Sequence, residues 1–276
     1  MRSLADELNI KGLDMIRHIE DEEQPAEVTG LEFIKSDETF SITGLENIRH
    51  IIETDMPPVS EFAVELLRLA ATAKDLDHEL NIHGAQVHRY EFAPVVLGSV
   101  VNDFEYRHNI RLPKAYRDFL TQVGNGGAGP DNGLFPLDML EFHNYYVHSG
   151  SSIHLSEAIE QPDYFTMPYK LDDKPVIINS ELTDLQWNEL CNELYSLKAK
   201  GNYEEYAKKR HEIYNGVIHI NSSIDNCGIL LVCDGDMSGE VIEMTGDLGR
   251  PYFLGMNFEE WMLGYFKSVI RQAERK

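Results

Sequence analysis

Apolar residues in the segment after residue 58 recur at the spacing of a helix. From Phe62 to Ala73 they recur every three or four residues, behind Ser60, whose hydroxyl suits a helix N-cap. This pattern predicts a helix that ends near Asp77. A short strand is predicted next, around residues 87–92.

A second helix is predicted after Leu112, with Pro113 at its first position, where a missing N–H costs nothing. Its apolar face repeats at i, i+3, i+4 and i+7: Tyr116, Phe119, Leu120 and Val123. We expect Gly124 to end this helix as a left-handed cap, followed by a glycine-rich loop to Gly133.

Two later regions also carry helical signals. Thr183 and Gln186 form a capping box before a helix striped by Trp187, and residues 203–214 supply its partner in a helical hairpin. A second capping box, Asn257 with Glu260, precedes a strongly apolar helix at the C-terminal end of the sequence.

Strand signals gather in the last third of the chain. Residues 217–220 and 228–233 are rich in large apolar residues, and residues 240–244 alternate. The turn residues at 234–239 make 228–244 a hairpin. Strands followed by a helix, without regular alternation, predict an α+β fold with a mixed or antiparallel sheet packed with helices.

Residues 1–57 read as a separate N-terminal extension of unknown role. Helices are predicted near residues 4–19 and 45–52, with a short strand near Phe33, and two prolines close the segment. It holds 14 acidic and five basic residues. The remaining residues, 58–276, are predicted to form one domain.

Charge changes this picture most. With 47 acidic and 24 basic residues the net charge is −23, which disfavours nucleic acid and anionic membranes as partners. Two windows, residues 118–169 and 211–249, contain no lysine or arginine and seven acids each. They predict either a solvated acidic surface or a face matched to a basic protein. The candidate partner-binding residues come from these windows: Asp131, Asp138, Glu141, Asp234, Asp236, Glu240 and Glu243.

Several motifs that suggest chemistry lack its context. The glycines at 124, 126 and 129 fit a dinucleotide fingerprint, but a helix rather than a strand precedes them. The start of a calcium loop at Asp234 has Thr245 where the bidentate glutamate belongs. Histidines and the three cysteines lack metal-site spacing. We therefore expect no catalysis, cofactor or metal. Without a signal peptide or an apolar span, a cytoplasmic location is expected.

Ordered motifs resemble a known family. Asn-Ile-Arg-Leu-Pro-Lys-Ala-Tyr-Arg-Asp-Phe-Leu (109–120), then Val-Gly-Asn-Gly-Gly (123–127) and Gly-Leu-Phe-Pro-Leu (133–137), resemble the SUKH superfamily, Smi/Knr-type. Asn-Cys-Gly (226–228), Gly-Glu-Val (239–241) and Asn-Phe-Glu-Glu-Trp (257–261) follow in the same order. The resemblance covers about residues 58–276, within which the helical hairpin at about 183–215 looks like an insertion seen in longer members. It assigns structural roles to Leu112, Pro113, Tyr116, Phe119, Leu120, Asn125, Gly126, Gly127, Gly133, Leu134, Gly228, Gly239 and Trp261.

The resemblance implies an α+β fold that binds protein without catalysis. Many bacterial members are immunity proteins that neutralise a polymorphic toxin, often a nuclease or nucleic-acid deaminase, while fungal relatives are interaction hubs in cell-wall signalling. Three hypotheses stand: an immunity protein with a basic toxin partner, a regulatory or scaffolding protein without one, and a hydrolase that uses acids and histidines. The oligomeric state is open.

Overall fold

The computed structural model divides the chain into two compact units, Met1–Pro58 and Val59–Lys276. The residues that it describes are 32–36, 39–43, 58–140, 168–172, 178, 182–222, 228–244 and 250–275. In the first unit, β1 (Glu32–Ser36) and β2 (Thr39–Thr43) form an antiparallel hairpin. The helices predicted near residues 4–19 and 45–52 lie outside the described part of the chain.

The second unit is built on a four-stranded antiparallel sheet with the order β3-β4-β5-β6. Its strands are β3 (Val217–Ser222), β4 (Gly228–Val232), β5 (Glu240–Met244) and β6 (Pro251–Asn257). The predicted 228–244 hairpin is confirmed as β4 and β5. The pattern missed β6, because Pro251 and Gly255 argue against a strand and are tolerated only where a sheet has an edge or a bulge.

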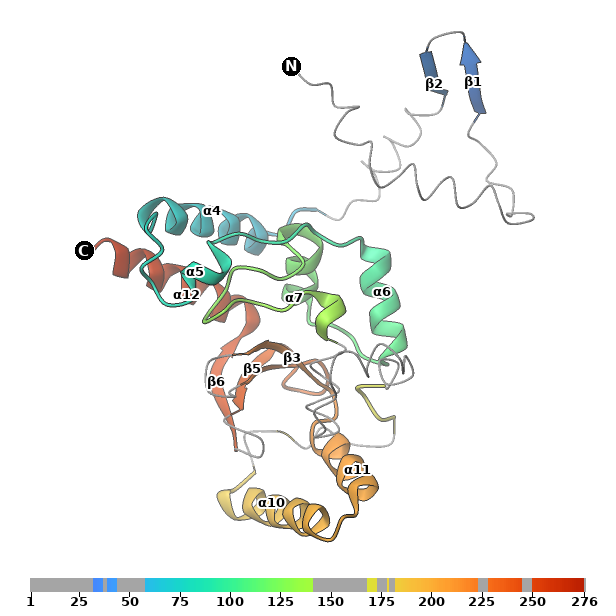
Figure 1. Cartoon of the computed structure of the whole chain (residues 1–276), viewed down its shortest axis with the longest axis vertical. Coiled ribbons are helices and arrows are strands. Elements are labelled where there is room, and N and C mark those ends of the chain that lie inside the picture. The colour runs from blue at the N-terminus through green and yellow to red at the C-terminus, as the bar shows by residue number, and fades with distance from the viewer. Residues whose placement is uncertain are drawn as a thin grey trace. The chain divides into compact units, whose positions relative to one another are not determined.

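Helices are present with this sheet, which confirms the predicted α+β class (Figure 1). Before the sheet come α4 (Glu61–Leu76), α5 (Ala85–His88), α6 (Gly98–Arg107), α7 (Lys114–Asp118) and the π-helical turn η1 (Phe119–Val123). The hairpin helices are α10 (Asp184–Ala199) and α11 (Tyr203–Ile213), and α12 (Phe258–Ala273) follows the sheet.

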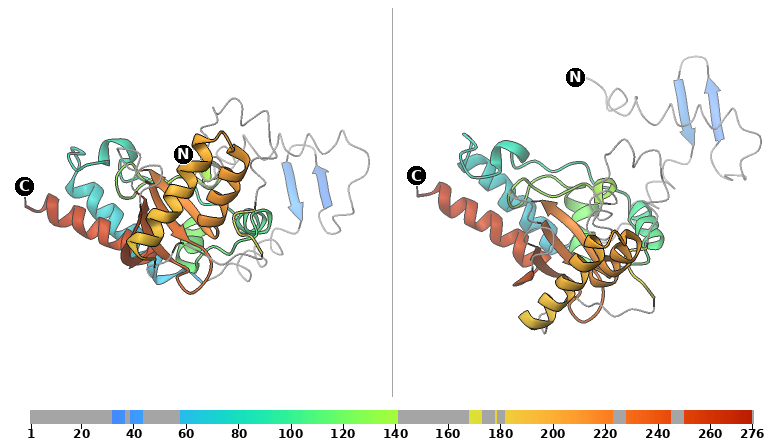
Figure 2. Two further views of the ribbon diagram at one scale, coloured as in Figure 1. Left: turned by 90° about the horizontal axis from the view of Figure 1, so that it is seen from below. Right: turned by 60° about the horizontal axis from the view of Figure 1, so that its bottom comes forward.

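Both faces of the sheet are buried along β3, β4 and β5, each in its own hydrophobic cluster. Along β4 the side chains alternate, so that Ile229 and Leu231 pack with α4, α7 and α12, while Leu230 and Val232 pack with α10 and α11. All five residues of β4 are therefore buried, which explains its unbroken apolar sequence. The three layers, with helices on both sides of the sheet, are visible in Figure 2.

The helix after Leu112 differs from its prediction at both ends. Pro113 occupies the N-cap, with φ −53° and ψ 142°, one position before the predicted one. At the other end the backbone widens into η1, and the Gly124 N–H donates to the Phe119 carbonyl at 2.9 Å. Gly124 is extended rather than left-handed, with φ 176°. A glycine is needed there because a Cβ would lie 2.5 Å from the Phe92 Cβ.

The strand predicted at residues 87–92 is wrong. Residues 85–88 form α5, and Arg89 and Tyr90 follow with positive φ angles of 51° and 58°. Only Phe92 forms an isolated bridge, to Gly127. Helix α6 was not predicted. Its buried apolar residues are only Val101 and Phe104, and residues with weak helix propensity flank them.

Candidate functional site

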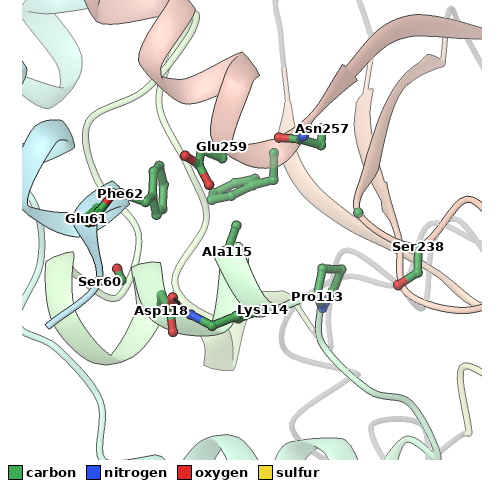
Figure 3. A pocket seen from close by; sticks show the side chains of 12 residues that line it. Ser60, Glu61, Phe62, Pro113, Lys114, Ala115, Asp118, Ser238, Asn257 and Glu259 are labelled. Carbon is green, nitrogen blue, oxygen red and sulfur yellow. Dashed lines mark hydrogen bonds and ion pairs between the residues drawn. The ribbon is translucent and has the colours of Figure 1, made fainter. Parts of the chain in front are cut away.

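Four segments that are distant in sequence enclose a groove of about 430 Å³. The starts of α4 and α12, the first turns of α7 and the turn between β4 and β5 line it. Figure 3 shows Glu259 on α12, Glu61 and Phe62 on α4, Lys114 and Asp118 on α7, and Ser238 from the turn around this space. Helices α4 and α12 both begin at the groove.

Local hydrogen bonds fix the helix starts at the groove. The Ser60 hydroxyl accepts the Ala63 N–H at 3.1 Å, which caps α4 as the sequence predicts. The Asn257 side chain accepts the Glu260 N–H at 3.0 Å, and the Glu260 carboxylate accepts the Asn257 N–H at 3.1 Å, so the predicted capping box is confirmed. These caps leave the groove with defined walls.

The turn between β4 and β5 is tied to the same wall. The Phe258 N–H donates to the Gly239 carbonyl at 3.0 Å, which joins the turn to the start of α12. Gly239 has φ +99°, a conformation that residues with a Cβ rarely adopt. Its glycine therefore allows the chain to turn against α12.

Packed aromatic rings lie beneath the groove. The ring centroids of Phe258 lie 6.2 Å from Phe62 and 5.0 Å from Tyr116, in edge-to-face arrangements. Phe258 and Tyr116 are fully buried. Burial also raises the pKa of the Tyr116 hydroxyl, so this phenol stays neutral. The groove consequently has a rigid apolar base beneath a polar rim.

Carboxylates outnumber cations among the lining residues. Glu61, Asp118 and Glu259 carry negative charge, and Lys114 is the single lysine or arginine among the described residues that line the groove. The Lys114 Nζ forms an ion pair with the Asp118 Oδ2 at 2.5 Å. The positive charge of Lys114 is therefore already paired within the groove. Glu61 and Glu259 are exposed, and among the described residues neither has a salt bridge.

Helix dipoles reduce this negative charge without reversing it. An α-helix carries roughly half a positive charge at its N-terminus, so α4 and α12 together offset about one carboxylate. Glu61 and Glu259 stand in the first turns, where acidic side chains stabilise helices. An anion would meet these carboxylates at short range, whereas a cationic side chain would be attracted. The groove is thus suited to basic ligands.

Two of the acids singled out from the sequence lie beside this groove. Asp236 is exposed in the turn between β4 and β5, and Glu240 pairs in register with Asn257, a lining residue. Asp234 precedes them, but its carboxylate faces a different depression and pairs with Lys170 at 3.1 Å. Asp236 of the turn and Glu240 at the start of β5 therefore lie in the groove's surroundings, while Asp234 is used in an ion pair.

The other candidates lie elsewhere. Asp131 follows Pro130, whose carbonyl accepts a hydrogen bond from the Asn221 side chain at 2.8 Å. Asn221 lies near the end of β3 at which Ser222 pairs with Gly228. Asp234 follows the opposite end of β4, so Asp131 and Asp234 are at opposite ends of the strand pair. Glu243 pairs with Tyr252 on β6, Asp138 is exposed, and Glu141 lies outside the described residues.

Sequence reasoning missed Glu61, Lys114 and Glu259 as candidate site residues. Glu61 and Glu259 follow helix caps, where acids are common for the stability of the helix itself, so position alone does not single them out. Their meeting depends on the packing of α4 against α12. The signal that was available is the family resemblance, because three of its segments, around Pro113, Gly239 and Asn257, line the groove.

The remaining motif residues have packing or backbone contacts. The apolar ones are buried in the cluster between the sheet and α4, α7 and α12: Leu112, Tyr116, Phe119, Leu120, Leu134 and Trp261. The Asn125 side chain accepts the Leu137 N–H at 2.7 Å. Gly126, Gly127 and Gly133 have positive φ, and a Cβ on Gly228 would lie 2.6 Å from the His219 ring.

The described residues provide neither a metal-binding cluster nor a membrane-spanning helix. Nowhere in them do three His, Cys, Asp or Glu side chains gather as a metal site would require. Within the same ranges, the helices are all too short or too polar to span a bilayer.

Comparison with known proteins gives one finding that bears on identity. No curated protein and no solved structure matches the chain. A family model described as SMI1 / KNR4 family (SUKH-1) matches residues 99–264, which is more than half of the chain and includes α7, the sheet and the start of α12. The protein therefore belongs to the SMI1 / KNR4 family (SUKH-1).

Proposed function

We propose that this protein is a non-catalytic immunity protein of a bacterial toxin system, and that it holds a basic segment of a nuclease or deaminase toxin in the acidic groove. The observation that carries the proposal is the pair Glu61 and Glu259. Both carboxylates are exposed at the rim, and neither has a salt bridge within the described ranges. A cationic side chain of a partner would supply the missing charge.

The chemistry of such a toxin matches the charge of this protein. Enzymes that act on nucleic acid need a basic surface to hold the phosphate backbone. A protein with a net charge of −23 attracts that surface over distance, which raises the association rate at low salt. The groove then provides a local contact in which arginine or lysine meets two carboxylates.

The groove is better suited to a protein than to a small molecule. Its rim consists of the ends of helices and a turn, and its apolar base is already filled by packed rings. Small-molecule sites are concave and lined mainly by apolar groups with a few polar ones. Here seven of the twelve lining residues are polar or charged, as at the rim of a protein–protein contact.

The first test is capture followed by neutralisation. The full chain is used as bait in a lysate of its own organism, at low and at about 0.5 M salt, where exposed charge pairs are screened. Captured proteins are identified by mass spectrometry and expressed alone and together with this chain. We expect a basic domain that is toxic alone and harmless when the two are expressed together.

Matched variants connect the result to the groove. Glu61→Gln with Glu259→Gln removes two first-turn charges at the groove, and Glu204→Gln with Glu205→Gln removes two first-turn charges on α11. Protection should weaken in the first pair only. Recovery of signalling or housekeeping proteins that are not toxic would overturn the immunity proposal and favour a regulatory or scaffolding role.

A further inference from the structure

Strand β6 forms one edge of the sheet, and no described strand pairs with its outer side. In the strand order β3-β4-β5-β6 it is the last strand, and among the described residues it pairs with β5 alone. The opposite edge differs, because β3 is bridged to Leu134 at Asn221, and the Phe135 N–H donates to the Ile220 carbonyl at 2.9 Å. The position of β6 at the side of the sheet can be followed in Figure 1.

This edge lacks the charges that usually protect one. Its sequence is Pro-Tyr-Phe-Leu-Gly-Met-Asn, with no acid or base, in a chain that is 26% charged. Natural edge strands discourage pairing with other chains by means of charges, prolines, bulges or short length. Here Pro251 restricts the first residue, and the pairing with β5 shifts register between Phe253 and Asn257, around Gly255 with φ +66°, so regular pairing is confined to the residues before this shift. Tyr252, between Pro251 and this shift, is 65% exposed.

The β6 edge is continuous with the acidic groove. Asn257 is both the last residue of β6 and a lining residue of the groove, and Glu259 follows two positions later. A strand advances about 3.3 Å per residue, so a segment paired with β6 reaches the groove rim within a few residues. Main-chain pairing on the edge and charge pairing in the groove thus form one contact surface.

The features of β6 favour a partner segment over a second copy of this chain. Self-pairing would bring together two proteins that each carry a net charge of −23. The kink at Gly255 would also confine regular pairing to the few residues before it, too little for an interface of the usual size. An extended segment of a basic partner avoids both difficulties, because its charge is attracted and a single short strand is sufficient.

We propose that the partner adds an extended segment to the β6 edge, with uncharged residues opposite Tyr252–Leu254 and one or more basic residues that enter the groove. This inference rests on the proposed function, since it assumes that the groove binds basic protein. The backbone of β6 supplies hydrogen bonds that do not depend on partner sequence, and the groove supplies the preference for cations.

The probe is a phage-displayed library of random 12-residue peptides, selected on the full chain at low salt. Selected peptides are synthesised, and backbone hydrogen exchange of the full chain is measured with and without each peptide. We expect slower exchange across residues 251–257 and enrichment of lysine or arginine at one end of the peptide. Tyr252→Ser should weaken binding about twofold to fivefold, since cross-strand aromatic contacts are lost.

Tyr203→Ser is the matched control, because Tyr203 is 64% exposed but lies on α11. It should leave peptide affinity unchanged. Peptides that depend on Glu61 and Glu259 but leave β6 exchange unaltered would overturn the edge inference and leave the groove proposal standing. Peptides that protect β6 but ignore both glutamates would support the edge and count against the groove. A library that yields no binder would overturn the edge inference, while the toxin neutralisation test still judges the function.

Discussion

The two ends of α4 use carboxylates in opposite ways. At the first turn, Glu61 is exposed at the groove and has no basic partner among the described residues. At the C-cap, Asp77 is 4% exposed and accepts three hydrogen bonds: from the N–H groups of Asn81 and Ile82 at 3.0 and 3.1 Å, and from the Tyr90 hydroxyl at 2.7 Å. A carboxylate is therefore free to bind a partner at one end of α4, and a carboxylate stabilises the fold at the other end.

His88 extends the buried end into a larger polar network. Its Nδ1 accepts the Tyr90 N–H at 3.0 Å, and its Nε2 lies 3.1 Å from the Tyr265 hydroxyl on α12. Burial lowers the pKa of His88 from 6.5 to about 4. Satisfied polar groups hold the loop after α4 against α12, whereas the groove keeps its charges available. We expect mutations at the two ends to affect different measurements.

The largest effect is expected from Asp77→Ala. The substitution leaves two backbone N–H groups and the Tyr90 hydroxyl without their acceptor, so the free energy of unfolding should fall by about 3 kcal/mol. Urea denaturation measures it. Asp75→Ala, an exposed neighbour on α4, should change it by less than about 0.5 kcal/mol. A loss under about 1 kcal/mol in Asp77→Ala would contradict the role assigned to the network.

The next effect is a pH dependence that belongs to His88. Since its pKa is about 4 when folded and 6.5 when exposed, the unfolded chain binds more protons between these values. The contribution of the neutral His88 to the free energy of unfolding is complete above pH 6.5. It falls by up to about 3 kcal/mol as the pH drops towards 4. Protonation of Nδ1 would also remove the acceptor of the Tyr90 N–H.

The measurement compares urea denaturation of the wild type and of His88→Gln from pH 7 to pH 4. Other groups titrate in both proteins, so the difference between the two curves isolates His88. That difference should shrink as the pH falls. Parallel curves over the whole range would show that His88 does not carry this dependence.

A smaller effect is expected on partner binding at the groove, where α4 begins. Glu61→Gln with Glu259→Gln should weaken affinity for the captured partner about tenfold at ~0.05 M salt, because two partly desolvated charge pairs are lost. The difference should narrow to about twofold at ~0.5 M salt, where screening weakens the wild-type contact. Titration calorimetry at both salt concentrations measures it. An equal loss in Glu204→Gln with Glu205→Gln would show that only net charge matters.

The smallest effect is expected on stability at that same end. Glu61 and Glu259 are exposed and have no salt bridge within the described ranges, so their replacement removes only first-turn interactions with the helix dipoles. The free energy of unfolding should fall by no more than about 1 kcal/mol. A loss comparable to that of Asp77→Ala would remove the distinction between the two ends of α4.

Several elements could be predicted from residues that are close together in the sequence. Ser60, Thr183 and Asn257 cap the helices that they were predicted to cap, because a capping bond joins residues only three positions apart. The hairpin of β4 and β5 followed from apolar runs on either side of a turn. The family resemblance, found from the order of motifs, is confirmed by the family model over residues 99–264.

Other elements depended on distant contacts. The segment at 87–92 has the composition of a strand, yet Arg89 and Tyr90 adopt positive φ, and the Tyr90 hydroxyl bonds to Asp77. Gly124 is required by the approach of Phe92, not by a left-handed cap. Pro251 and Gly255 suggested a loop, and only the place of β6 at the sheet edge makes a strand compatible with them.

By itself, the sequence determined the capped starts of α4, α10 and α12, the buried strands, the acidic charge and the family. Each depends on local hydrogen bonds, on periodicity or on composition, which residues close in the chain define. Only the tertiary structure decided that Glu61, Lys114 and Glu259 share one groove and that β6 ends at its rim. Their meeting arises from the packing of α4, α7 and α12 through Phe62, Tyr116 and Phe258, and such long-range packing leaves no periodic trace in the sequence.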